Sequence, residues 1–168
     1  VTLVTGPTEI KKPMFVKIVP VTTAKEMFEA VKEEAADADI VCKAAAVADY
    51  RPKHIADEKV KKSDSEMSLE LEKTDDILGY LGEHRLPGQF LCGFSMETEH
   101  MLENSRAKLA KKNADMIVAN NLKVAGAGFG TDTNVVTLIT ADDCRELEIM
   151  SKADVASAIV SEILKKMC

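Results

Sequence analysis

Aromatic residues are scarce in this chain of 168 residues: they make up 4% of it, and tryptophan is absent. A surface that stacks nucleic-acid bases needs several aromatic side chains, so this scarcity argues against such a platform. The net charge of -6 argues against a general nucleic-acid binder, which needs an excess of lysine and arginine. We therefore expect no nucleic-acid partner, although the lysines cluster enough to form a local pocket for a nucleotide.

Signals for membranes, secretion and metals are also missing from the sequence. No apolar run reaches the length of about eighteen residues that a membrane helix requires, and no signal peptide is visible. The three histidines show no metal-ligand spacing. The four cysteines lack a C-x-x-C pair, and two of them lie in apolar strand-like runs, which is typical of reduced thiols in the cytosol. We expect a cytoplasmic protein that does not contact membranes.

The common nucleotide fingerprints do not occur either. No G-x-G-x-x-G follows the first strand, predicted at Val1–Thr5, and the chain has no G-x-x-x-x-G-K-S/T motif. No serine sits in a nucleophile elbow. The loop Gly126–Gly130 is rich in glycine but has no strand–loop–helix context, so by itself it indicates only a surface loop.

The apolar pattern predicts alternating strands and helices, which is typical of an α/β fold with a mainly parallel sheet covered by helices. A capping box, Thr23-x-x-Glu26, begins a helix whose inner face carries apolar residues. The last helix is predicted over Ser151–Met167. The expected strands are Val1–Thr5, Phe15–Val19, Asp39–Ala46, Gln89–Phe94, Met116–Ala119 and Val135–Thr140, with a further helix over Glu99–Asn113. The expected buried helix faces are Met27, Phe28, Val31 and Ala35, and Ala156, Ile159, Val160, Ile163, Leu164 and Met167.

An excursion from Val47 to Lys73 interrupts this alternation. It is polar and bears lysines, and its segment Ser68–Glu72 alternates as an antiparallel or edge strand does. Thr74 then caps a short helix with two aspartates in its first turn, Asp75 and Asp76. We interpret the excursion as a flap within one domain, since 168 residues suit a single core.

Four strand ends carry small or polar residues where ligands bind in open α/β sheets. They are Ala44–Asp49, Gly93–Ser95, Ala119–Asn121 and the 126–134 loop. Lysines add positive charge: Lys59, Lys61 and Lys62 lie in the flap, and Lys108 and Lys112 share a helix face. Such a cluster suits a triphosphate; the alternative is that these lysines are simply solvated.

Taken together, these segments resemble the synthetase domain of bacterial phosphopantothenoylcysteine synthetase, which is often fused to a flavin-dependent decarboxylase. The matching motifs follow the family's order over nearly the whole chain. They are AAAVADYRP (Ala44–Pro52), EKVKK (Glu58–Lys62), LEKTDDIL (Leu71–Leu78), GFSMETE (Gly93–Glu99), AKLAKKNADMIVAN (Ala107–Asn120) and FGTDTNVVTLI (Phe129–Ile139).

The resemblance implies a CTP-dependent ligase of coenzyme A biosynthesis. It joins 4'-phosphopantothenate to L-cysteine through an acyl-cytidylate, with Mg²⁺ on the triphosphate. It also implies a Rossmann-like, three-layer fold and a homodimer with substrate sites near its interface. Lys59 is the expected catalytic residue and a nucleotide contact, and Asn120 is a weaker candidate. The other implied nucleotide contacts are Lys43, Ala44, Ala45, Asp49, Asp75, Asp76, Ile77, Leu78, Phe94, Lys108 and Lys112.

The chain departs from the family pattern in three places. Thr74-Asp75-Asp76 lacks the usual proline, and GFSMETE replaces the commoner GFAAETE, which brings the bulkier Met96 near the base pocket. The chain also begins at what resembles the family's second strand. We therefore expect one CTP-binding domain over residues 1–168 that lacks its first strand, glycine-rich turn and helix, and that binds CTP with little synthesis.

Two other readings of the sequence stay open. One is a Rossmann-type, nicotinamide-dependent oxidoreductase, for which the EKVKK flap and AVADYRP are unnecessary. The other is a non-catalytic nucleotide-binding or dimerisation module, in which Ser68–Glu72 and Val135–Thr140 pair between subunits.

Overall fold

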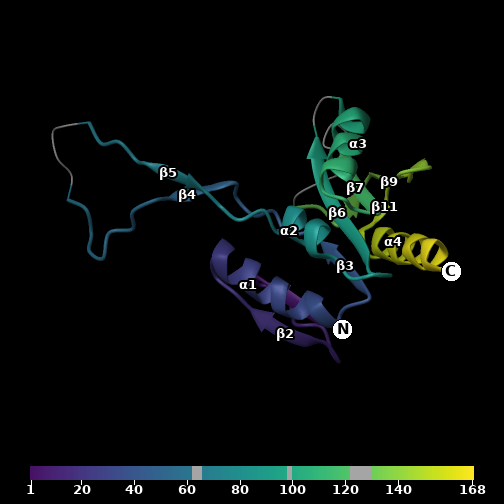
Figure 1. Cartoon of the computed structure of the whole chain (residues 1–168), viewed down its shortest axis with the longest axis horizontal. Coiled ribbons are helices and arrows are strands. Elements are labelled where there is room, and N and C mark those ends of the chain that lie inside the picture. The colour runs from purple at the N-terminus through teal and green to yellow at the C-terminus, as the bar shows by residue number, and fades with distance from the viewer. Residues whose placement is uncertain (62–65, 98–99, 122–129) are drawn as a thin grey trace. The chain divides into compact units, whose positions relative to one another are not determined.

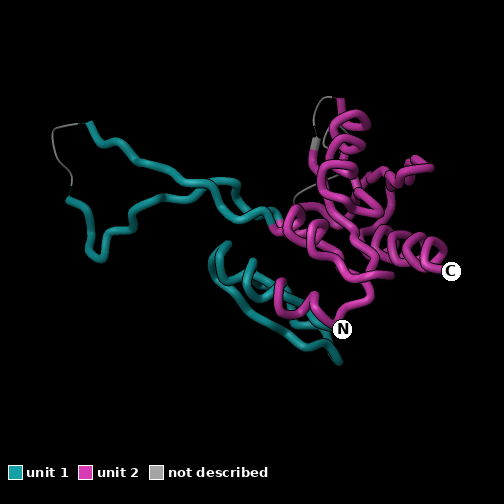
Figure 2. The backbone as a smooth tube through the Cα atoms, viewed as in Figure 1, with its two compact units in different colours: residues 1–31, 46–76 teal, residues 32–45, 77–168 magenta. Residues whose placement is uncertain are grey.

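The chain divides into two compact units, which the computed structural model describes over residues 1–61, 66–97, 100–121 and 130–168. Unit 1 comprises residues 1–31 and 46–76, and unit 2 comprises residues 32–45 and 77–168 (Figure 2). No helix in the described ranges combines the length and the apolar character that crossing a bilayer requires. The elements in chain order are β1 (Thr2–Thr5), β2 (Lys17–Pro20), α1 (Ala24–Glu34), the short 3-10 helix η1 (Ala35–Asp37), β3 (Ile40–Lys43), β4 (Tyr50–Pro52), β5 (Leu71–Lys73), α2 (Ile77–His84), β6 (Phe90–Glu97), α3 (Met101–Lys111), β7 (Met116–Asn121), β8 (Thr133–Asn134), β9 (Val136–Thr140), β10 (Cys144–Glu146), β11 (Met150–Ser151) and α4 (Lys152–Met167) (Figure 1).

The predicted capping box begins α1 in unit 1. The Glu26 amide donates to Thr23 Oγ1 at 3.1 Å, and the Glu26 carboxylate accepts from the Thr23 and Thr22 amides at 3.0 and 2.6 Å. These amide hydrogen bonds, that from Thr22 first, hold the pKa of Glu26 below its ordinary value. Just before the helix, β1 and β2 form a parallel pair. The capping box is thus confirmed, and the apolar face of α1 is only partly buried.

The flap contains a two-stranded ribbon in which β4 pairs antiparallel with β5. Arg51 and Glu72 lie opposite each other and form an ion pair of 2.7 Å. The edge strand predicted at Ser68–Glu72 is confirmed in part, because β5 begins at Leu71 and ends at Lys73. Strand β4 lies in a part of the excursion for which we predicted no strand. The prediction that Thr74 caps α2 was wrong, because its hydroxyl donates to the Ala48 carbonyl at 2.6 Å and α2 begins three residues later.

Unit 2 is built on a five-stranded sheet in the order β10-β9-β7-β6-β3. Strands β3, β6 and β7 are parallel, but β9 is antiparallel to β7 and to β10. The α/β class is confirmed, with a mixed sheet in place of the mainly parallel one that we predicted. Since β9 has a strand on both sides and its five residues are all buried, the pairing of Val135–Thr140 between subunits is wrong.

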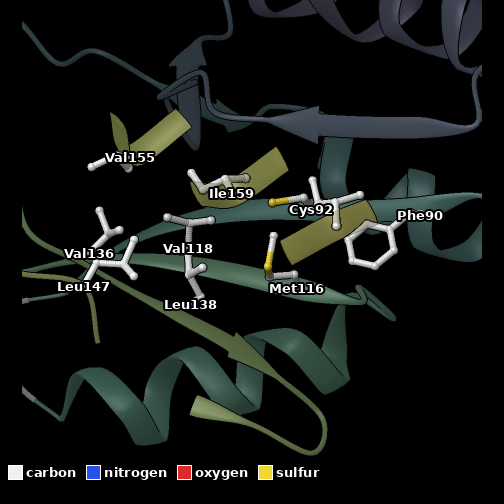
Figure 3. Packing of buried hydrophobic residues seen from close by; sticks show 10 residues of the cluster. Phe90, Cys92, Met116, Val118, Val136, Leu138, Leu147, Val155 and Ile159 are labelled. Atoms are coloured by element: carbon white, nitrogen blue, oxygen red, sulfur yellow. The ribbon is translucent and has the colours of Figure 1, made fainter. Parts of the chain in front are cut away.

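Helices cover both faces of this sheet. Alternate strand residues meet the inner face of α4, where the core includes Phe90, Cys92, Met116, Val118, Val136, Leu138, Val155, Ile159 and Ile163 (Figure 3). On the other face, α2 and α3 approach β6 through Leu78 and Ser105.

Helix α4 begins where the sequence predicts, because Ser151 Oγ accepts from the Asp154 amide at 3.1 Å. Its buried face is narrower than predicted. Val160, Leu164 and Met167 are 41–53% exposed, and Ala156 is exposed as well. Only Val155, Ile159 and Ile163 are buried along this helix, so the apolar pattern overestimated the width of the contact with the sheet.

Candidate nucleotide site

The carboxyl end of β3 lies beside the middle of β6 in unit 2. Lys43, the last residue of β3, is in register with Gly93, so the chain leaves the sheet here while β6 continues. The Lys43 ammonium turns back and donates to the Ala45 carbonyl at 2.9 Å. The predicted contacts Lys43, Ala44 and Ala45 therefore lie at the end of β3, beside the strand that carries Phe94.

The start of α2 packs on the same part of β6. A Cβ atom at Gly93 would lie 2.6 Å from Leu78 Cδ2, so only glycine lets Leu78 sit this close to the strand. Ile77 and Leu78 are each 3% exposed. Their side chains belong to the interior of unit 2, so only their backbone groups are available to a ligand.

Lys108 of α3 reaches the same strand. Its ammonium donates to the Phe94 carbonyl at 2.9 Å, and the residue is half-buried. Lys112, one turn further along, is also half-buried. Neither lysine is therefore fully exposed, and Lys108 has a defined backbone partner. The Phe94 ring packs against the hydrophobic core on the α4 face, whereas Lys108 comes from the α3 face.

The predicted residues of unit 1 form a second group. The Asp49 carbonyl accepts from the Thr74 amide at 3.0 Å, so Asp49 lies beside the turn that holds Asp75 and Asp76. Lys59 lies in an exposed segment outside the helices and strands, as does Lys61. Lys62 and most of the glycine loop Gly126–Gly130 fall outside the described residues.

Each unit contains a shallow hollow. In unit 1, Ala46, Val47 and Ala48 line one of about 240 Å³, together with Gly6, Val21, Thr22, Thr23, Ala24 and Met27. The larger hollow, of about 340 Å³ in unit 2, lies between the end of α3 and the turn after β9. It is lined by none of the predicted nucleotide contacts, so its size alone does not mark the site.

Two further side-chain pairs occur along the strands of unit 2. The Asn120 side-chain oxygen accepts from Asn134 Nδ2 at 3.0 Å, which ties the end of β7 to β8. Cys42 and Cys92 face each other across β3 and β6. Their mutual hydrogen bond lowers the pKa of Cys42 and, with burial, raises that of Cys92. Both cysteines are free thiols.

Sequence reasoning missed the residues that hold α2 against the end of α3. Gly82 lies inside α2, where glycine is unfavourable, and a Cβ atom there would overlap the Lys112 carbonyl oxygen. Asn113 follows Lys112 with a positive φ of 46°. A glycine inside a helical pattern is a recognisable sign of close packing, and that signal was available in the sequence.

Comparison with known proteins places this geometry in a family. The profile of the DNA/pantothenate metabolism flavoprotein C-terminal domain matches residues 1–167. The coenzyme A biosynthesis bifunctional protein CoaBC of Bacillus subtilis is 48% identical over 165 residues, covering 97% of this chain and 40% of that protein. A cysteine/cysteine sulfinic acid decarboxylase from an unknown prokaryotic organism is 40% identical over 166 residues, covering 98% of this chain and 46% of that protein.

Solved structures agree with these matches. The crystal structure of the C-terminal domain of coenzyme A biosynthesis bifunctional protein CoaBC has a TM-score of 0.81 at 42% identity, covering 99% of this chain and 75% of that one. The chain spans less than half the length of the two curated relatives. The matches confirm the resemblance that the motifs indicated. The chain therefore belongs to the family of DNA/pantothenate metabolism flavoprotein C-terminal domains.

Proposed function

We propose that this chain is the phosphopantothenate–cysteine ligase part of a coenzyme A biosynthesis enzyme, and that it binds CTP. The observation that carries the proposal is the meeting of β3, β6, α2 and α3 in unit 2. There Lys43, Leu78 and Lys108 gather around the Gly93–Phe94 backbone. The identity of 48% to a CoaBC protein supports this assignment.

The chemistry requires an activated acid, because forming an amide from a carboxylate is uphill. A carboxylate oxygen of 4'-phosphopantothenate attacks the α-phosphorus of CTP, and the bond to the β-phosphate breaks to release pyrophosphate. The amine of L-cysteine then attacks the acyl carbon, loses a proton, and CMP leaves. Lysine ammonium groups offset the negative charge that develops on the phosphate oxygens.

Lys108 and Lys112 are the groups that we assign to the triphosphate. Both are half-buried, so their charges interact with an anion more strongly than freely hydrated ammonium groups would. Lys59 lies on the flap and is the residue that we assign to the activated intermediate and amide formation. In unit 2 we also assign the backbone of Lys43–Ala45 and of Ile77–Leu78 to the nucleotide. In unit 1, considered by itself, we assign Asp49, Asp75 and Asp76 as nucleotide contacts.

Magnesium enters this proposal on the triphosphate. The described residues include no group of three or more His, Cys, Asp or Glu side chains placed to hold a metal ion. Mg²⁺ commonly takes phosphate oxygens and waters as most of its ligands and needs few from the protein. The chain fits an ion that arrives with CTP better than one held in a protein cage.

The wider assembly is part of the proposal. We assign unit 2 to a Rossmann-like, three-layer architecture and the β4–β5 ribbon to a homodimer contact. The ribbon exposes apolar side chains, including Tyr50 at 54% and Leu71 at 52%. A flavin-dependent decarboxylase fused to this domain is expected from the bifunctional relatives.

Parallel calorimetric titrations of the chain with CTP, ATP and NADH test the nucleotide assignment. We expect CTP to bind more tightly than ATP and NADH not to bind. Binding of NADH without CTP would support a nicotinamide-dependent oxidoreductase instead, and equal binding of CTP and ATP would contradict the CTP assignment.

A Lys59→Gln substitution in the full-length enzyme tests the catalytic assignment. We expect CTP-dependent release of pyrophosphate in a single turnover to continue while amide formation is lost. Lys61→Gln, also in the exposed flap, is the control. Full amide formation by Lys59→Gln would favour a non-catalytic role for the flap.

A further inference from the structure

We infer that the C-terminal half of α2 positions Lys112, so that Gly82 and Asn113 set the affinity for a nucleoside triphosphate without touching it. This inference rests on the proposed role of Lys112 in binding the triphosphate of CTP. It concerns residues that form no part of the predicted site, and it assigns them a positioning role.

The first observation is the close approach of two backbones. A Cβ atom at Gly82 would overlap the Lys112 carbonyl oxygen and would lie 2.8 Å from the Lys112 carbonyl carbon. The obstacle is backbone, which cannot rotate away as a flexible side chain can. Any residue other than glycine at this position must therefore move the end of α3 or part of α2.

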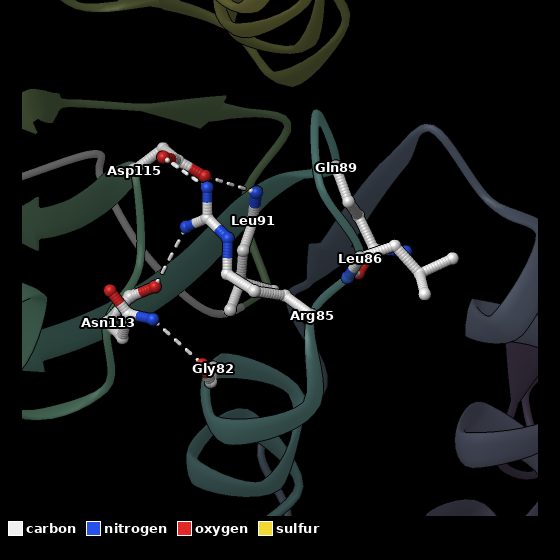
Figure 4. Close-up of polar contacts among 7 residues, drawn as sticks. All are labelled: Gly82, Arg85, Leu86, Gln89, Leu91, Asn113 and Asp115. Atoms are coloured by element: carbon white, nitrogen blue, oxygen red, sulfur yellow. Dashed lines mark hydrogen bonds and ion pairs between the residues drawn. The ribbon is translucent and has the colours of Figure 1, made fainter.

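The second observation is that the Asn113 side chain is held by Gly82 of α2 and its backbone by Arg85, the residue that follows α2. Its Nδ2 donates to the Gly82 carbonyl at 2.8 Å, and its own carbonyl accepts from Arg85 Nη1 at 3.1 Å (Figure 4). Asn113 has a φ of 46°, a left-handed conformation that asparagine tolerates better than most residues. The side chain and the carbonyl of Asn113 are thus fixed relative to Gly82 and Arg85.

The third observation is that the contacts of Asn113 with Gly82 and Arg85 are linked to the sheet. Arg85 Nη2 pairs with Asp115 Oδ1 at 3.1 Å, and Asp115 Oδ2 accepts from the Leu91 amide at 2.7 Å (Figure 4). The Asp115 amide in turn donates to the Leu91 carbonyl at 2.9 Å. The contacts run from α2 through Asn113 and Asp115 to the first residues of β6.

Lys112 directly precedes Asn113, and its carbonyl oxygen faces Gly82. It is the C-cap of α3, and its amide bonds back to the Lys108 carbonyl at 2.9 Å. The backbone from which its ammonium group projects is therefore fixed relative to Lys108, which itself contacts β6 at Phe94. Charge stabilisation depends on such placement, since a displacement of about 1 Å is enough to weaken binding or catalysis severely.

The test compares CTP with CMP, which lacks the β- and γ-phosphates. Asn113→Gly keeps a residue that accepts positive φ and removes only the side-chain bond to Gly82. We expect it to raise the Kd for CTP by about tenfold, with the Kd for CMP unchanged. Gly82→Ala is expected to have a larger effect of the same kind, and Glu83→Ala, an exposed neighbour on α2, is the control.

Circular dichroism and thermal melting of each variant show whether it is folded, and Asn113→Gly keeps the test decisive if Gly82→Ala does not fold. Equal losses for CTP and CMP, or unchanged CTP binding by folded Asn113→Gly, would overturn the inference. Lys112→Met distinguishes the role of Lys112 in binding CTP from the positioning role of Gly82 and Asn113. If it weakens CTP binding and Asn113→Gly does not, only the positioning role fails. If the unmodified chain does not bind CTP, the proposed function fails and the inference fails with it.

Discussion

The hydroxyl oxygens of Ser95 and Ser105 lie 2.8 Å apart, and both residues are almost completely buried, at 2% and 0% exposure. This hydrogen bond joins β6 to α3, one helical turn before Lys108. Each hydroxyl thus has a protein partner in place of the water molecule to which it would bond in the unfolded chain. Because neither group is reachable by solvent, the two serines stabilise the structure only as a pair.

We expect the two single serine substitutions together to lower the free energy of unfolding by more than the double substitution does. Ser95→Ala or Ser105→Ala leaves one buried hydroxyl without its partner, which costs about 1–3 kcal/mol of unfolding free energy. The double variant removes both polar groups, so its loss should be smaller than the sum of the single losses. Urea unfolding of the four proteins measures the coupling, and additive losses would show that the pair is not a unit.

Lys108 is expected to dominate CTP binding among the lysines of α3. Lys108→Met should raise the Kd for CTP by about ten- to a hundredfold, because a charge-assisted contact to phosphate is lost. Lys111→Met, on the exposed side of the same helix, removes the same charge from the chain and should have little effect. Calorimetric titration distinguishes the two, and equal effects would indicate general charge attraction in place of a defined contact.

The β4–β5 ribbon is expected to hold the homodimer together. Leu71→Glu places a charge on an apolar ribbon residue that is 52% exposed, and we expect it to give monomers in sedimentation equilibrium. Ile149→Glu, at 54% exposure in unit 2, is the matched control and should leave the dimer intact. A dimer that survives Leu71→Glu but not Ile149→Glu would move the interface away from the ribbon.

Asp142 and Lys166 are expected to make stability depend on pH at both ends of the scale. The Lys166 ammonium lies 2.8 Å from Asp142 Oδ1, and its hydrogen bond, with that of Thr140, holds the pKa of Asp142 below its ordinary 3.8. The same bond raises the pKa of Lys166 above its ordinary 10.5. The Asp142 contribution is therefore present above pH 3.8 and lost as pH falls through its lowered pKa. The Lys166 contribution is present below pH 10.5 and lost as pH rises through its raised pKa.

Melting temperatures of the parent chain and of Asp142→Asn, measured across this range, check the prediction. The two proteins should differ most near neutral pH and converge in strong acid. Added salt should narrow the difference, because this pair is accessible to solvent. A difference that persists in strong acid would indicate that the substitution disturbs the turn for another reason.

The sequence predicts local features of the fold better than long-range ones. The capping box of Thr23 and Glu26 involves neighbours in the chain and occurs as predicted, and the last helix, predicted over Ser151–Met167, begins within one residue of the expected position. Strand direction is different, because a β-branched run such as Val136–Thr140 looks the same whether its partner is parallel or antiparallel. Strand β4 escaped prediction because it is short, contains Pro52, and finds its partner about twenty positions later.

The site follows the same division. Motifs located Lys108 and Phe94, and the structure brings them together, but no motif predicts that the ammonium meets a backbone carbonyl. Thr74 is the reverse case. The sequence predicted that its hydroxyl caps the helix that follows, but the hydroxyl donates to the carbonyl of Ala48, which is distant in the chain. Gly82 depends on the backbone of a segment about thirty positions away, and sequence pattern alone does not specify such a contact.

The parallel pairing of β3 with β6 also fixes an order of events during synthesis. Ile40 pairs with Phe90, so β3 leaves the ribosome fifty positions before its partner exists. At about 5–20 residues per second, its apolar residues wait several seconds before they can be paired. The segment from β6 through α3 to β9 is continuous in the chain and can assemble as it emerges. Strand β3 therefore waits longer for its partner than any other strand of this sheet while the protein is being made.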